Sequence, residues 1–417
     1  MRVVIVGNGI AGANVAFGLR QKNSKTEILV LSAENYPVYD PCTLPYFVGE
    51  EISKDVVFVK QLSDYQKQNI EVVFDEKVLS IDSKQKTVNT SIHQYPYDEL
   101  VLAYGGDLFV PPIDGINLLG VFGGKSLTHT EELDKHSGRR AVVIGSGAIG
   151  VEFAVALKLK KYEVTLIELC DWILPTMFDK KPADILKQLL ESNGIRVLTK
   201  EKVLTIEGKT KVSAVITDQR KITCDTIIMA TGVVVDKALA QSADVAVDHA
   251  ILVNTQMQTN VSDIYACGDC AETLDICADQ MCVYQLKHNA IAQAKIVVQN
   301  ILGEKDVYPG SYQYARIHFF DTHAASFGTT LNLIDNRDDI EVIDRGAEDD
   351  FLRVILKRGK IIGAQAIGKS AYGLWILMNA MWKQDDIHEI RKNWEEINNI
   401  DSPFPWEYRK LGELLKL

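Results

Sequence analysis

Two glycine-rich turns are the segments of this chain whose residue types and spacing point most directly to chemistry. They begin 138 residues apart. In such a turn the first glycine allows a tight bend, the second lets the backbone approach a pyrophosphate, and the third lets the following helix pack against the preceding strand. Each turn therefore predicts a site where a pyrophosphate rests on a helix N-terminus. The residues predicted to form these sites are Gly7, Gly9, Ile10, Ala11 and Gly12 in the first turn and Gly145, Gly147, Ala148, Ile149 and Gly150 in the second.

The elements that must position these turns are visible on either side of them. A β-branched run from Arg2 to Val6 precedes the first turn, and an apolar stretch follows it. The second turn lies in the same way between the run Arg140–Ile144 and an apolar helical stretch that carries Glu152. One glycine motif alone is weak evidence. Two copies that each join a predicted strand to a predicted helix indicate two dinucleotide-binding domains.

An acidic residue at the end of the second strand of such a unit binds the ribose hydroxyls of the adenosine half. In the second unit the strand 162–167 ends at Glu168, which lies 23 residues after Gly145. A carboxylate here would repel the 2′-phosphate of NADPH, and no arginine follows it directly, so we expect NADH to be preferred. In the first unit the corresponding strand is followed by Ser32 and Glu34, either of which could bind the ribose.

The composition is that of an ordinary globular protein. The 417 residues are 47% hydrophobic and 24% charged, which excludes a disordered or fibrous chain and suffices for two or three domains. The balance of 45 Lys and Arg against 56 Asp and Glu gives a net charge of −11, so nucleic acid and anionic membrane surfaces are poor candidate partners. No apolar stretch reaches the roughly 18 residues of a membrane span. Seven cysteines do not suggest a disulfide framework, and we expect a cytoplasmic protein.

The order of the motifs resembles that of the FAD- and NAD(P)-dependent pyridine nucleotide-disulfide oxidoreductases. The stretch Thr226–Gly232 is similar to that family's strand and Ala-Thr-Gly turn, and Ile264–Ala271 is similar to its second FAD motif. A third stretch, Lys287–Ala290, resembles the segment beside the flavin ring. One motif departs from the pattern, because Tyr104 stands where the first Ala-Thr-Gly turn would have threonine. The resemblance implies that FAD is bound by Gly105, Asp269 and Asn289 and that NAD is bound by Gly232.

The resemblance also implies the architecture, an α/β fold in which two Rossmann-like dinucleotide-binding domains are interleaved. The FAD-binding domain would comprise residues 1–112 and 238–308, and the NAD-binding domain would be the insertion 113–237. Residues 311–417 would form a C-terminal α+β interface domain, through which the family usually dimerises. In that domain two apolar runs, Phe351–Leu356 and Ile361–Gln365, are separated by a polar turn and predict a β-hairpin.

Cys42 is the residue that the resemblance marks for redox chemistry. The run Cys42–Tyr46 is similar to that of the family's single-cysteine branch, which contains coenzyme A-disulfide reductases, persulfide reductases and NADH oxidases. In that branch a helix dipole and the flavin favour the thiolate, which attacks a disulfide. A small buried cysteine in a loop shaped by proline is the alternative. The same resemblance places Glu152 near the nicotinamide and the flavin, and the alternative there is a capping or solvated acid.

Two features favour a different branch of the family. The coenzyme A-disulfide reductases carry a tyrosine just before a Pro-Phe pair near the C-terminus, and Ile400 stands at that position. The sequence Tyr39–Cys42 instead resembles the FAD subunits of phenylglyoxylate dehydrogenase and of tungsten-containing aldehyde oxidoreductase, which exchange electrons with iron–sulfur partners. The cysteine spacings do not predict a cluster or a metal site, and we expect Cys267 and Cys270 to pack against FAD.

These observations give one leading hypothesis and two alternatives. We expect an FAD-dependent NADH:acceptor oxidoreductase that serves as the electron-transfer subunit of a larger complex, with an iron–sulfur protein as its partner. The enzymatic alternative is a stand-alone reductase of coenzyme A disulfide, persulfide or oxygen that uses Cys42. The other alternative is a binding or assembly protein without turnover, against which the intact Asp269 and the two glycine turns argue. No metal ion is expected.

Overall fold

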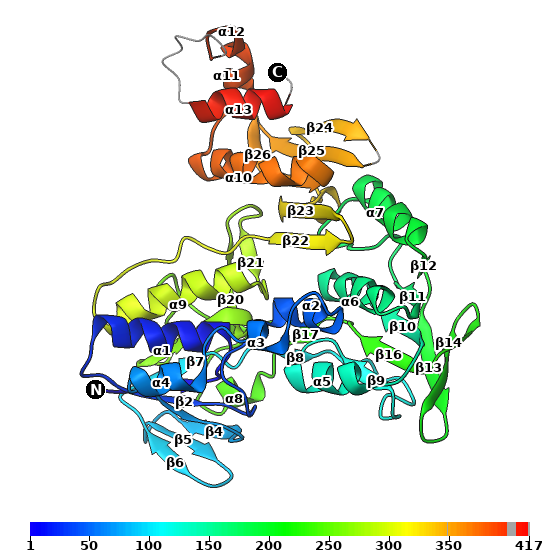
Figure 1. Cartoon of the computed structure of the whole chain (residues 1–417). Coiled ribbons are helices and arrows are strands. Elements are labelled where there is room, and N and C mark those ends of the chain that lie inside the picture. Colours follow the sequence, from blue (N-terminus) through cyan, green and yellow to red (C-terminus); the bar gives the residue numbers. More distant parts are fainter. Residues whose placement is uncertain (348, 398–405, 416–417) are drawn as a thin grey trace. The chain divides into compact units, whose positions relative to one another are not determined.

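The computed structural model describes residues 1–347, 349–397 and 406–415 and has a mixed α/β fold that contains two parallel sheets (Figure 1). Contacts within the chain divide it into two compact units. The first unit contains residues 1–47, 51–109 and 232–312, and the second contains residues 48–50, 110–231 and 313–417. The two units are therefore interleaved in the sequence.

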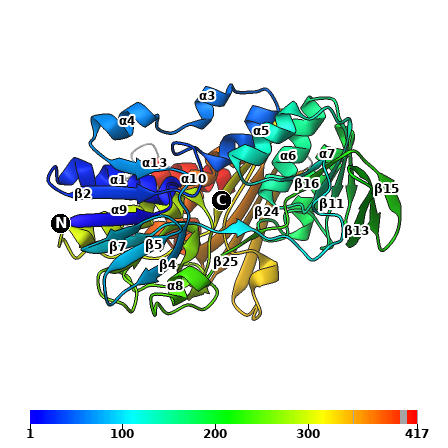
Figure 2. The ribbon, with the colours of Figure 1, turned by 90° about the horizontal axis from the view of Figure 1, so that it is seen from below.

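The first unit is built around a parallel sheet of five strands. Their order is β19 (Ile264–Ala266), β7 (Glu99–Leu102), β1 (Arg2–Val6), β2 (Glu27–Leu31) and β3 (Glu71–Val73). The central strand β1 is almost completely buried from Val3 to Val6, which is the pattern of a parallel strand covered on both faces. Helices α1 (Ile10–Lys22) and α9 (Lys287–Ile301) lie side by side next to this sheet (Figures 1 and 2). The predicted strand Arg2–Val6 is confirmed.

Smaller elements complete the first unit. Its short helices are α2 (Leu44–Val48), α3 (Lys54–Val57), α4 (Leu62–Lys67) and α8 (Ala238–Gln241). One antiparallel sheet contains β4 (Val78–Asp82), β5 (Thr87–Thr90) and β6 (Gln94–Pro96). A two-stranded sheet pairs β8 (Asp107–Leu108) with β17 (Val233–Val234), and a three-stranded sheet joins β18 (Ile251–Leu252), β20 (Ala271–Asp275) and β21 (Gln280–Cys282).

The second unit contains another parallel sheet of five strands. Their order is β12 (Ile195–Leu198), β11 (Glu163–Ile167), β10 (Arg140–Ile144), β16 (Thr226–Met229) and β9 (Val121–Gly123). Its helices are α5 (Leu127–Lys135), α6 (Ala148–Leu159) and α7 (Lys180–Ser192). An antiparallel sheet of β13 (Val203–Gly208), β14 (Val212–Thr217) and β15 (Lys221–Thr223) lies between β12 and β16 in the sequence.

The two parallel sheets repeat one topology. Each contains a strand, β1 or β10, that is followed by a glycine turn, a helix and two further parallel strands on one side of it. In each a three-stranded antiparallel sheet then precedes the return of the chain to the other side of β1 or β10, as β7 or β16. The fifth strand differs, because β19 follows the rest of its sheet in the sequence whereas β9 precedes it. Two Rossmann-type folds in one chain are thus observed, as predicted.

The C-terminal sheet is antiparallel and belongs to the second unit. Its five strands are β22 (Tyr314–Phe319), β23 (Thr322–Gly328), β26 (Lys360–Ile367), β25 (Asp350–Lys357) and β24 (Ile340–Ala347) in spatial order. Strands β25 and β26 pair as a hairpin, which confirms the prediction for this segment. Helices α10 (Leu374–Lys383), α11 (Ile387–Lys392), α12 (Trp394–Ile397) and α13 (Trp406–Leu415) follow the sheet.

The chain passes between the two units after residues 47, 50, 109, 231 and 312. The predicted division into FAD-binding, NAD-binding and interface domains, with boundaries at 112, 237 and 308–311, stays a prediction. Position 400, where the coenzyme A-disulfide reductases carry a tyrosine, lies outside the described residues. In the part of the chain that is described, no helix is both long enough and apolar enough to cross a membrane.

A half-buried acid lies at the N-terminal end of β7, at the opposite end of the sheet from the glycine turn. The Oε2 atom of Glu99 is buried without a hydrogen-bond partner. Burial and the nearby Asp263 raise the pKa of Glu99 from 4.5 to about 7, and Lys86 opposes them only in part. Between about pH 4.5 and pH 7, the Glu99 carboxyl of the folded protein therefore retains a proton that it has already lost in the unfolded chain. This proton contributes stability below the unfolded pKa, and the contribution is lost as the pH rises through about 7.

We expect Glu99→Gln to raise the apparent melting temperature of the FAD-loaded protein at about pH 8 and to change it little at about pH 5. A neutral amide avoids the cost of ionising a half-buried carboxyl. Solvent screening limits that cost to about 1 kcal/mol, or about 2 °C. The exposed Glu71 on the same sheet provides the control Glu71→Gln, which should show no pH-dependent difference. Equal shifts in the two variants at the higher pH would contradict this assignment.

Candidate functional site: two dinucleotide cradles and a capped cysteine turn

The first glycine turn uses its three glycines in two different ways. Gly7 has φ +106°, and a Cβ atom there would lie 2.3 Å from the carbonyl oxygen of Ala103. A Cβ atom on Gly12 would lie 2.0 Å from the carbonyl oxygen of Gly7. Gly9 has ordinary extended geometry, with φ −76°, and a Cβ atom there would meet nothing within 4 Å. Gly7 and Gly12 are therefore required by the fold, whereas Gly9 borders open space at the start of α1.

The second turn has the same geometry in the second unit. Gly145 has φ +99°, and its Cβ atom would lie 2.3 Å from the carbonyl oxygen of Ala230. A Cβ atom on Gly150 would lie 2.0 Å from the carbonyl oxygen of Gly145. Gly147, with φ −64°, again borders open space, and the helix that begins at Ala148 follows it directly. Each turn thus leaves a cradle at a helix N-terminus that a side chain would fill and that a pyrophosphate fits.

The second residue of each turn is held by a buried side chain. In the first unit the side-chain oxygen of Asn8 accepts a hydrogen bond from the hydroxyl of Tyr65 at 2.8 Å. The side-chain amide of Asn8 donates to the backbone carbonyl oxygen of Tyr36 at 3.2 Å. In the second unit the carboxylate of Glu168 accepts both the N–H and the hydroxyl of Ser146, at 2.9 and 2.6 Å. These contacts fix the conformation of both turns before any ligand binds.

Glu168 lies where the sequence predicts a ribose-binding acid, directly after β11. It is 8% exposed, and its second carboxylate oxygen accepts the N–H of Cys170 at 2.8 Å. A carboxylate can accept about four hydrogen bonds, so these three leave capacity for a ribose hydroxyl. Glu168 therefore connects the glycine turn to the segment that follows the strand. Its role toward NAD stays a prediction.

Ser32 and Glu34 are the two residues predicted as candidates for binding the ribose in the first unit. The hydroxyl of Ser32 donates to the carbonyl oxygen of Glu34 at 2.8 Å. The Glu34 carboxylate accepts the hydroxyl of Tyr39 at 3.0 and 3.1 Å. Both residues follow β2, whose last carbonyl, that of Leu31, accepts the N–H of Gly7 at 2.8 Å. Both therefore lie at the sheet edge that carries the first turn.

The return segments over the two turns make the same backbone hydrogen bond, although Tyr104 stands in the first and Thr231 in the second. The N–H of Ala103 donates to the carbonyl oxygen of Val6 at 2.9 Å, and the N–H of Ala230 donates to that of Ile144 at 2.8 Å in the second unit. The glycines that follow have positive φ, +72° at Gly105 and +104° at Gly232, and a Cβ atom on either would meet nothing within 4 Å. Tyr104 directs its hydroxyl to the carbonyl oxygen of Asp236, at 2.9 Å.

Gly232 is predicted to bind NAD, but it begins a segment of the first unit. Its carbonyl oxygen accepts the N–H of Phe109, at 2.9 Å. The residue before it, Thr231, ends a segment of the second unit. Gly232 is thus at a point where the chain changes units, and its contact with NAD stays a prediction.

Asp269 is placed beside the first turn by the residue that precedes it. Gly268 has φ +79°, and a Cβ atom on it would lie 2.8 Å from the Cβ of Ala11. Its N–H donates to the buried Oε1 of Gln293 on α9, at 2.7 Å. This close approach to α1 brings Asp269 to the helix end where the pyrophosphate is predicted. The geometry is compatible with the predicted contact to the ribityl chain.

The buried side chain of Asn289 makes hydrogen bonds within the first unit. Its side chain is 1% exposed, and its amide donates to the carbonyl oxygen of Tyr312 at 3.1 Å. Its carbonyl accepts the hydroxyl of Tyr308 at 3.3 Å. The side chain thus holds the segment that leaves the first unit. The contact of Asn289 with flavin, for which the sequence resemblance was the reason, stays a prediction.

Cys42 lies in a single 3₁₀ turn, Pro41–Thr43, that leads directly into α2, and its side chain is exposed. Asp40 caps this turn. One of its carboxylate oxygens accepts the N–H of Cys42 at 3.1 Å, and its carbonyl oxygen accepts the Thr43 hydroxyl at 2.8 Å. The other carboxylate oxygen forms an ion pair with Lys287, the first residue of α9. The cysteine turn is thereby fixed to the helix that the resemblance places beside the flavin.

The sequence analysis did not identify the Asp40–Lys287 pair. An aspartate before Pro-x is a typical helix N-cap, so the role of Asp40 toward Cys42 could have been predicted from spacing alone. Lys287 is 247 residues away, and no local pattern links it to Asp40. Glu152 is on α6 and is 8% exposed, so the alternative of a solvated acid does not describe it. Its predicted place near the nicotinamide stays a prediction.

The Cys267–Cys270 pair is fully buried beside β7. The thiol of Cys270 donates to the carbonyl oxygen of Leu102 at 3.3 Å. Burial raises the pKa of Cys270 to about 12 and that of Cys267 well above its ordinary value, so both are neutral packing groups. Over residues 1–347, 349–397 and 406–415, no group of three or more His, Cys, Asp or Glu side chains is arranged to hold a metal ion.

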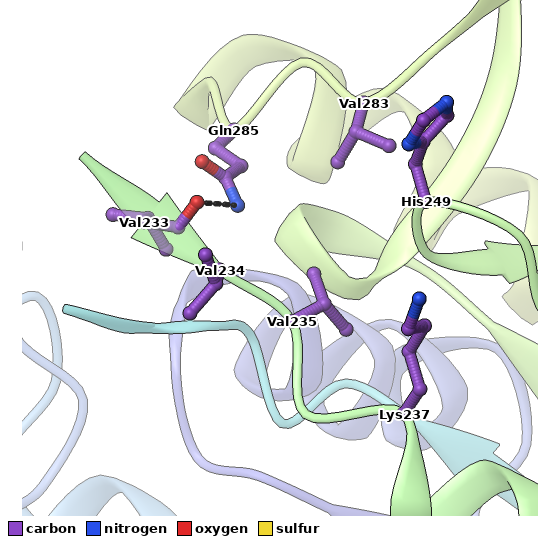
Figure 3. A pocket seen from close by; sticks show the side chains of 7 residues that line it. All are labelled: Val233, Val234, Val235, Lys237, His249, Val283 and Gln285. Carbon is purple, nitrogen blue, oxygen red and sulfur yellow. Dashed lines mark hydrogen bonds between the residues drawn. The ribbon is translucent and has the colours of Figure 1, made fainter. Parts of the chain in front are cut away.

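A pocket of about 350 Å³ opens in the first unit (Figure 3). Three consecutive valines at the end of β17 and Val283 form apolar walls, and three polar side chains lie around them. The amide of Gln285 donates to the carbonyl oxygen of Val233 at 3.4 Å, and Lys237 donates to that of Asp248 at 2.9 Å. The sequence analysis did not predict this pocket. Its lining residues are Val233, Val234, Val235, Lys237, His249, Val283 and Gln285.

The two parallel sheets, each with an open glycine cradle at its first helix, define a protein that binds two dinucleotides. Residues 1–294 match the family described as pyridine nucleotide-disulphide oxidoreductase. The chain belongs to this family, and it is an oxidoreductase that uses FAD and NAD(H).

Individual relatives differ in the activity that their names record. An NADH oxidase of Methanocaldococcus jannaschii is 32% identical over 397 residues, which cover 88% of each chain. The assimilatory nitrate reductase electron transfer subunit of Bacillus subtilis is 28% identical and is covered over 50% of its length, against 94% of this chain. The structure of an NAD-dependent persulfide reductase from A. fulgidus is 29% identical, with a TM-score of 0.89 over 94% of this chain and 79% of that one.

We expect substitutions at the two open glycines to separate the two cofactors. Gly9→Val should abolish FAD retention, because the added side chain extends into the first cradle from a Cβ atom that meets nothing within 4 Å. Gly147→Val should keep a normal flavin spectrum and raise the KM for NADH about tenfold or more. Each variant is the control for the other, since both leave the backbone unstrained. Loss of both cofactors from both variants would contradict the assignment.

Proposed function

We propose that this chain passes hydride between NADH, bound at the second glycine turn, and FAD, bound at the first. The observation that carries the proposal is the repeated cradle, in which Gly9 and Gly147 alone leave room at a helix N-terminus. When bound, FAD accepts a hydride from NADH and releases the electrons to an acceptor. The protein's own groups would bind and orient the two cofactors. Asp269 lies beside the first turn, where FAD is proposed to bind, and Glu168 holds the second turn, where NADH is proposed to bind.

The preference for NADH over NADPH rests on Glu168. Its carboxylate is 8% exposed and is fixed by the N–H and hydroxyl of Ser146. A fixed carboxylate at the ribose accepts hydrogen bonds from free hydroxyls, but it repels a 2′-phosphate. We also place the protein in a reducing compartment, the cytoplasm, as the odd number and wide spread of its seven cysteines favour.

We further propose that the acceptor is an iron–sulfur subunit of a larger redox complex. The resemblance of Tyr39–Cys42 to FAD subunits that exchange electrons with iron–sulfur partners supports this. In the structure the Asp40 carboxylate of this run accepts the N–H of Cys42 at 3.1 Å and pairs with Lys287. The Bacillus subtilis relative, named an electron transfer subunit, supports the same assignment.

The C-terminal region is the proposed contact region for a partner or a second copy of the chain. Residues Tyr372, Trp375 and Trp382, in and just before α10, expose 58%, 51% and 43% of their surface. Exposed aromatic side chains of this kind are enriched in protein interfaces. This supports an interface role for the region.

A stand-alone disulfide or persulfide reductase, or an NADH oxidase, is the second candidate. The exposed Cys42 at the start of α2 favours it, because a redox thiol must be accessible to its substrate. The relatives named NADH oxidase and NAD-dependent persulfide reductase support it as well. The two candidates share the hydride transfer and differ only in whether Cys42 takes part in the following step.

Replacing Cys42 decides between the two candidates. We expect Cys42→Ser to retain a normal flavin spectrum and to reduce an iron–sulfur ferredoxin with NADH within about twofold of the parent, because electron transfer from the flavin needs no thiol. Cys170→Ser, at the other exposed cysteine, is the matched control. A loss of ferredoxin reduction of about tenfold or more in Cys42→Ser alone, with flavin and NADH-to-dye activity retained, would overturn the electron-transfer mechanism.

The partner is tested by purifying the tagged full-length chain from its source organism. We expect it to elute with a second polypeptide that has iron–sulfur absorption, and NADH should reduce that absorption in the mixture. If the chain instead elutes alone as a homodimer and reduces coenzyme A disulfide rapidly, it is not an electron-transfer subunit.

A further inference from the structure

The segment 169–179, which joins Glu168 to α7, runs along the C-terminal sheet of the same unit. Gln313, just before β22, donates to the carbonyl oxygen of Thr176 at 2.6 Å. Asn332, in the loop after β23, donates to the carbonyl oxygen of Pro175 at 3.0 Å. Figure 1 shows α7 next to the strands of this sheet, and α7 contacts β26 directly.

The last residue of the segment, Asp179, makes several hydrogen bonds to the C-terminal sheet and its loops. It is 5% exposed and is the N-cap residue of α7. Its carboxylate accepts the N–H of Leu331 at 2.8 Å, the amide of Gln365 at 2.9 Å and the guanidinium of Arg353 at 3.1 Å. All three donors belong to the C-terminal sheet or its loops, so a buried charge of the dinucleotide-binding part depends on that sheet.

Arg353 is fixed in turn by a second acid. It is 8% exposed, and it makes two hydrogen bonds to Asp344 on β24, at 2.8 and 2.9 Å. Lys181 on α7 also pairs with Asp344, at 2.8 Å. Burial opposes ionisation of Asp344, but the bonds from Arg353 and Lys181 outweigh it and lower its pKa. The network is thus ionised and fully paired, the condition under which a buried ion pair is stable.

The middle of the segment contacts the second glycine turn. The N–H of Leu174 donates to the carbonyl oxygen and the hydroxyl of Ser146, at 3.0 and 3.3 Å. Leu174 is completely buried and has φ +54°, a strained conformation for a branched side chain. Such strain persists only where the surroundings over-determine the backbone. Here they are Ser146 on one side and the contacts of Asp179 with the C-terminal sheet on the other.

We propose that Asp179 and Arg353 are positioning residues for NAD. Through the segment 169–179, the C-terminal sheet holds Ser146 and Glu168 in the geometry that receives the adenosine half of the dinucleotide. The inference rests on the NAD site proposed above. It adds that Arg353, which lies on a separate sheet 174 positions after Asp179, helps to set the affinity of that site for NAD. Neither residue is required to touch NAD.

The test is steady-state kinetics of the FAD-loaded full chain with a dye as acceptor. Arg353→Met should raise the KM for NADH about tenfold, because it leaves Asp179 and Asp344 without their shared cation and releases the segment. The kcat and the flavin spectrum should not change. Arg353→Lys, which keeps the charge but not the fork of donors, should give a smaller rise of about threefold. Arg358→Met is the matched control, since Arg358 pairs with Asp339 at the exposed end of the same sheet.

A purely structural role is separated from positioning by the double variant Asp179→Asn with Arg353→Met. Removing both charges should restore much of the apparent melting temperature lost in Arg353→Met, while the KM for NADH stays raised. A lowered melting temperature with an unchanged KM in both Arg353 variants would overturn the proposal. If Arg353→Met does not fold, Arg353→Lys and the double variant decide it in the same way. An unchanged KM in Gly147→Val would show instead that the NAD site itself is wrong.

Discussion

The close approach of helix to strand in the two glycine turns is the constraint on which the rest of the structure depends. A Cβ atom on Gly12 or Gly150 would lie 2.0 Å from a carbonyl oxygen of its own turn, so no other residue fits there. The first N–H groups of a helix have no partner within the helix, and the space beside Gly9 and Gly147 at the two helix ends is open. Binding of an anion is therefore a consequence of the packing that forms the fold.

Different contacts fix the glycine turns of the two units. In the first unit a neutral contact, Tyr65 to Asn8, fixes the turn, whereas in the second the carboxylate of Glu168 does so. The second turn is further connected, through the segment before α7, to the buried pair of Asp179 and Arg353. The first turn is thus fixed by contacts with α4 and with the segment after β2, whereas the second turn is also connected to the C-terminal sheet.

Local patterns in the sequence were sufficient for the turns, their flanking strands and the β25–β26 hairpin, because glycine spacing and apolar runs act over about ten residues. Contacts between charged residues far apart in sequence could not be predicted. Asp40 and Lys287 are 247 positions apart, and no sequence pattern in either segment predicts their contact. The contacts of Asn289 with Tyr308 and Tyr312 could not be predicted either, because the positions of both tyrosines depend on the tertiary fold.

The central claim is that one chain holds both cofactors so that NADH reduces its flavin directly. Anaerobic titration of the purified FAD-loaded protein with NADH, followed by the visible flavin absorbance, tests it without any assumption about the acceptor. The account predicts that the absorbance is bleached in proportion to added NADH, with an endpoint at one NADH per flavin. A protein that retains FAD but is not bleached by excess NADH would contradict it.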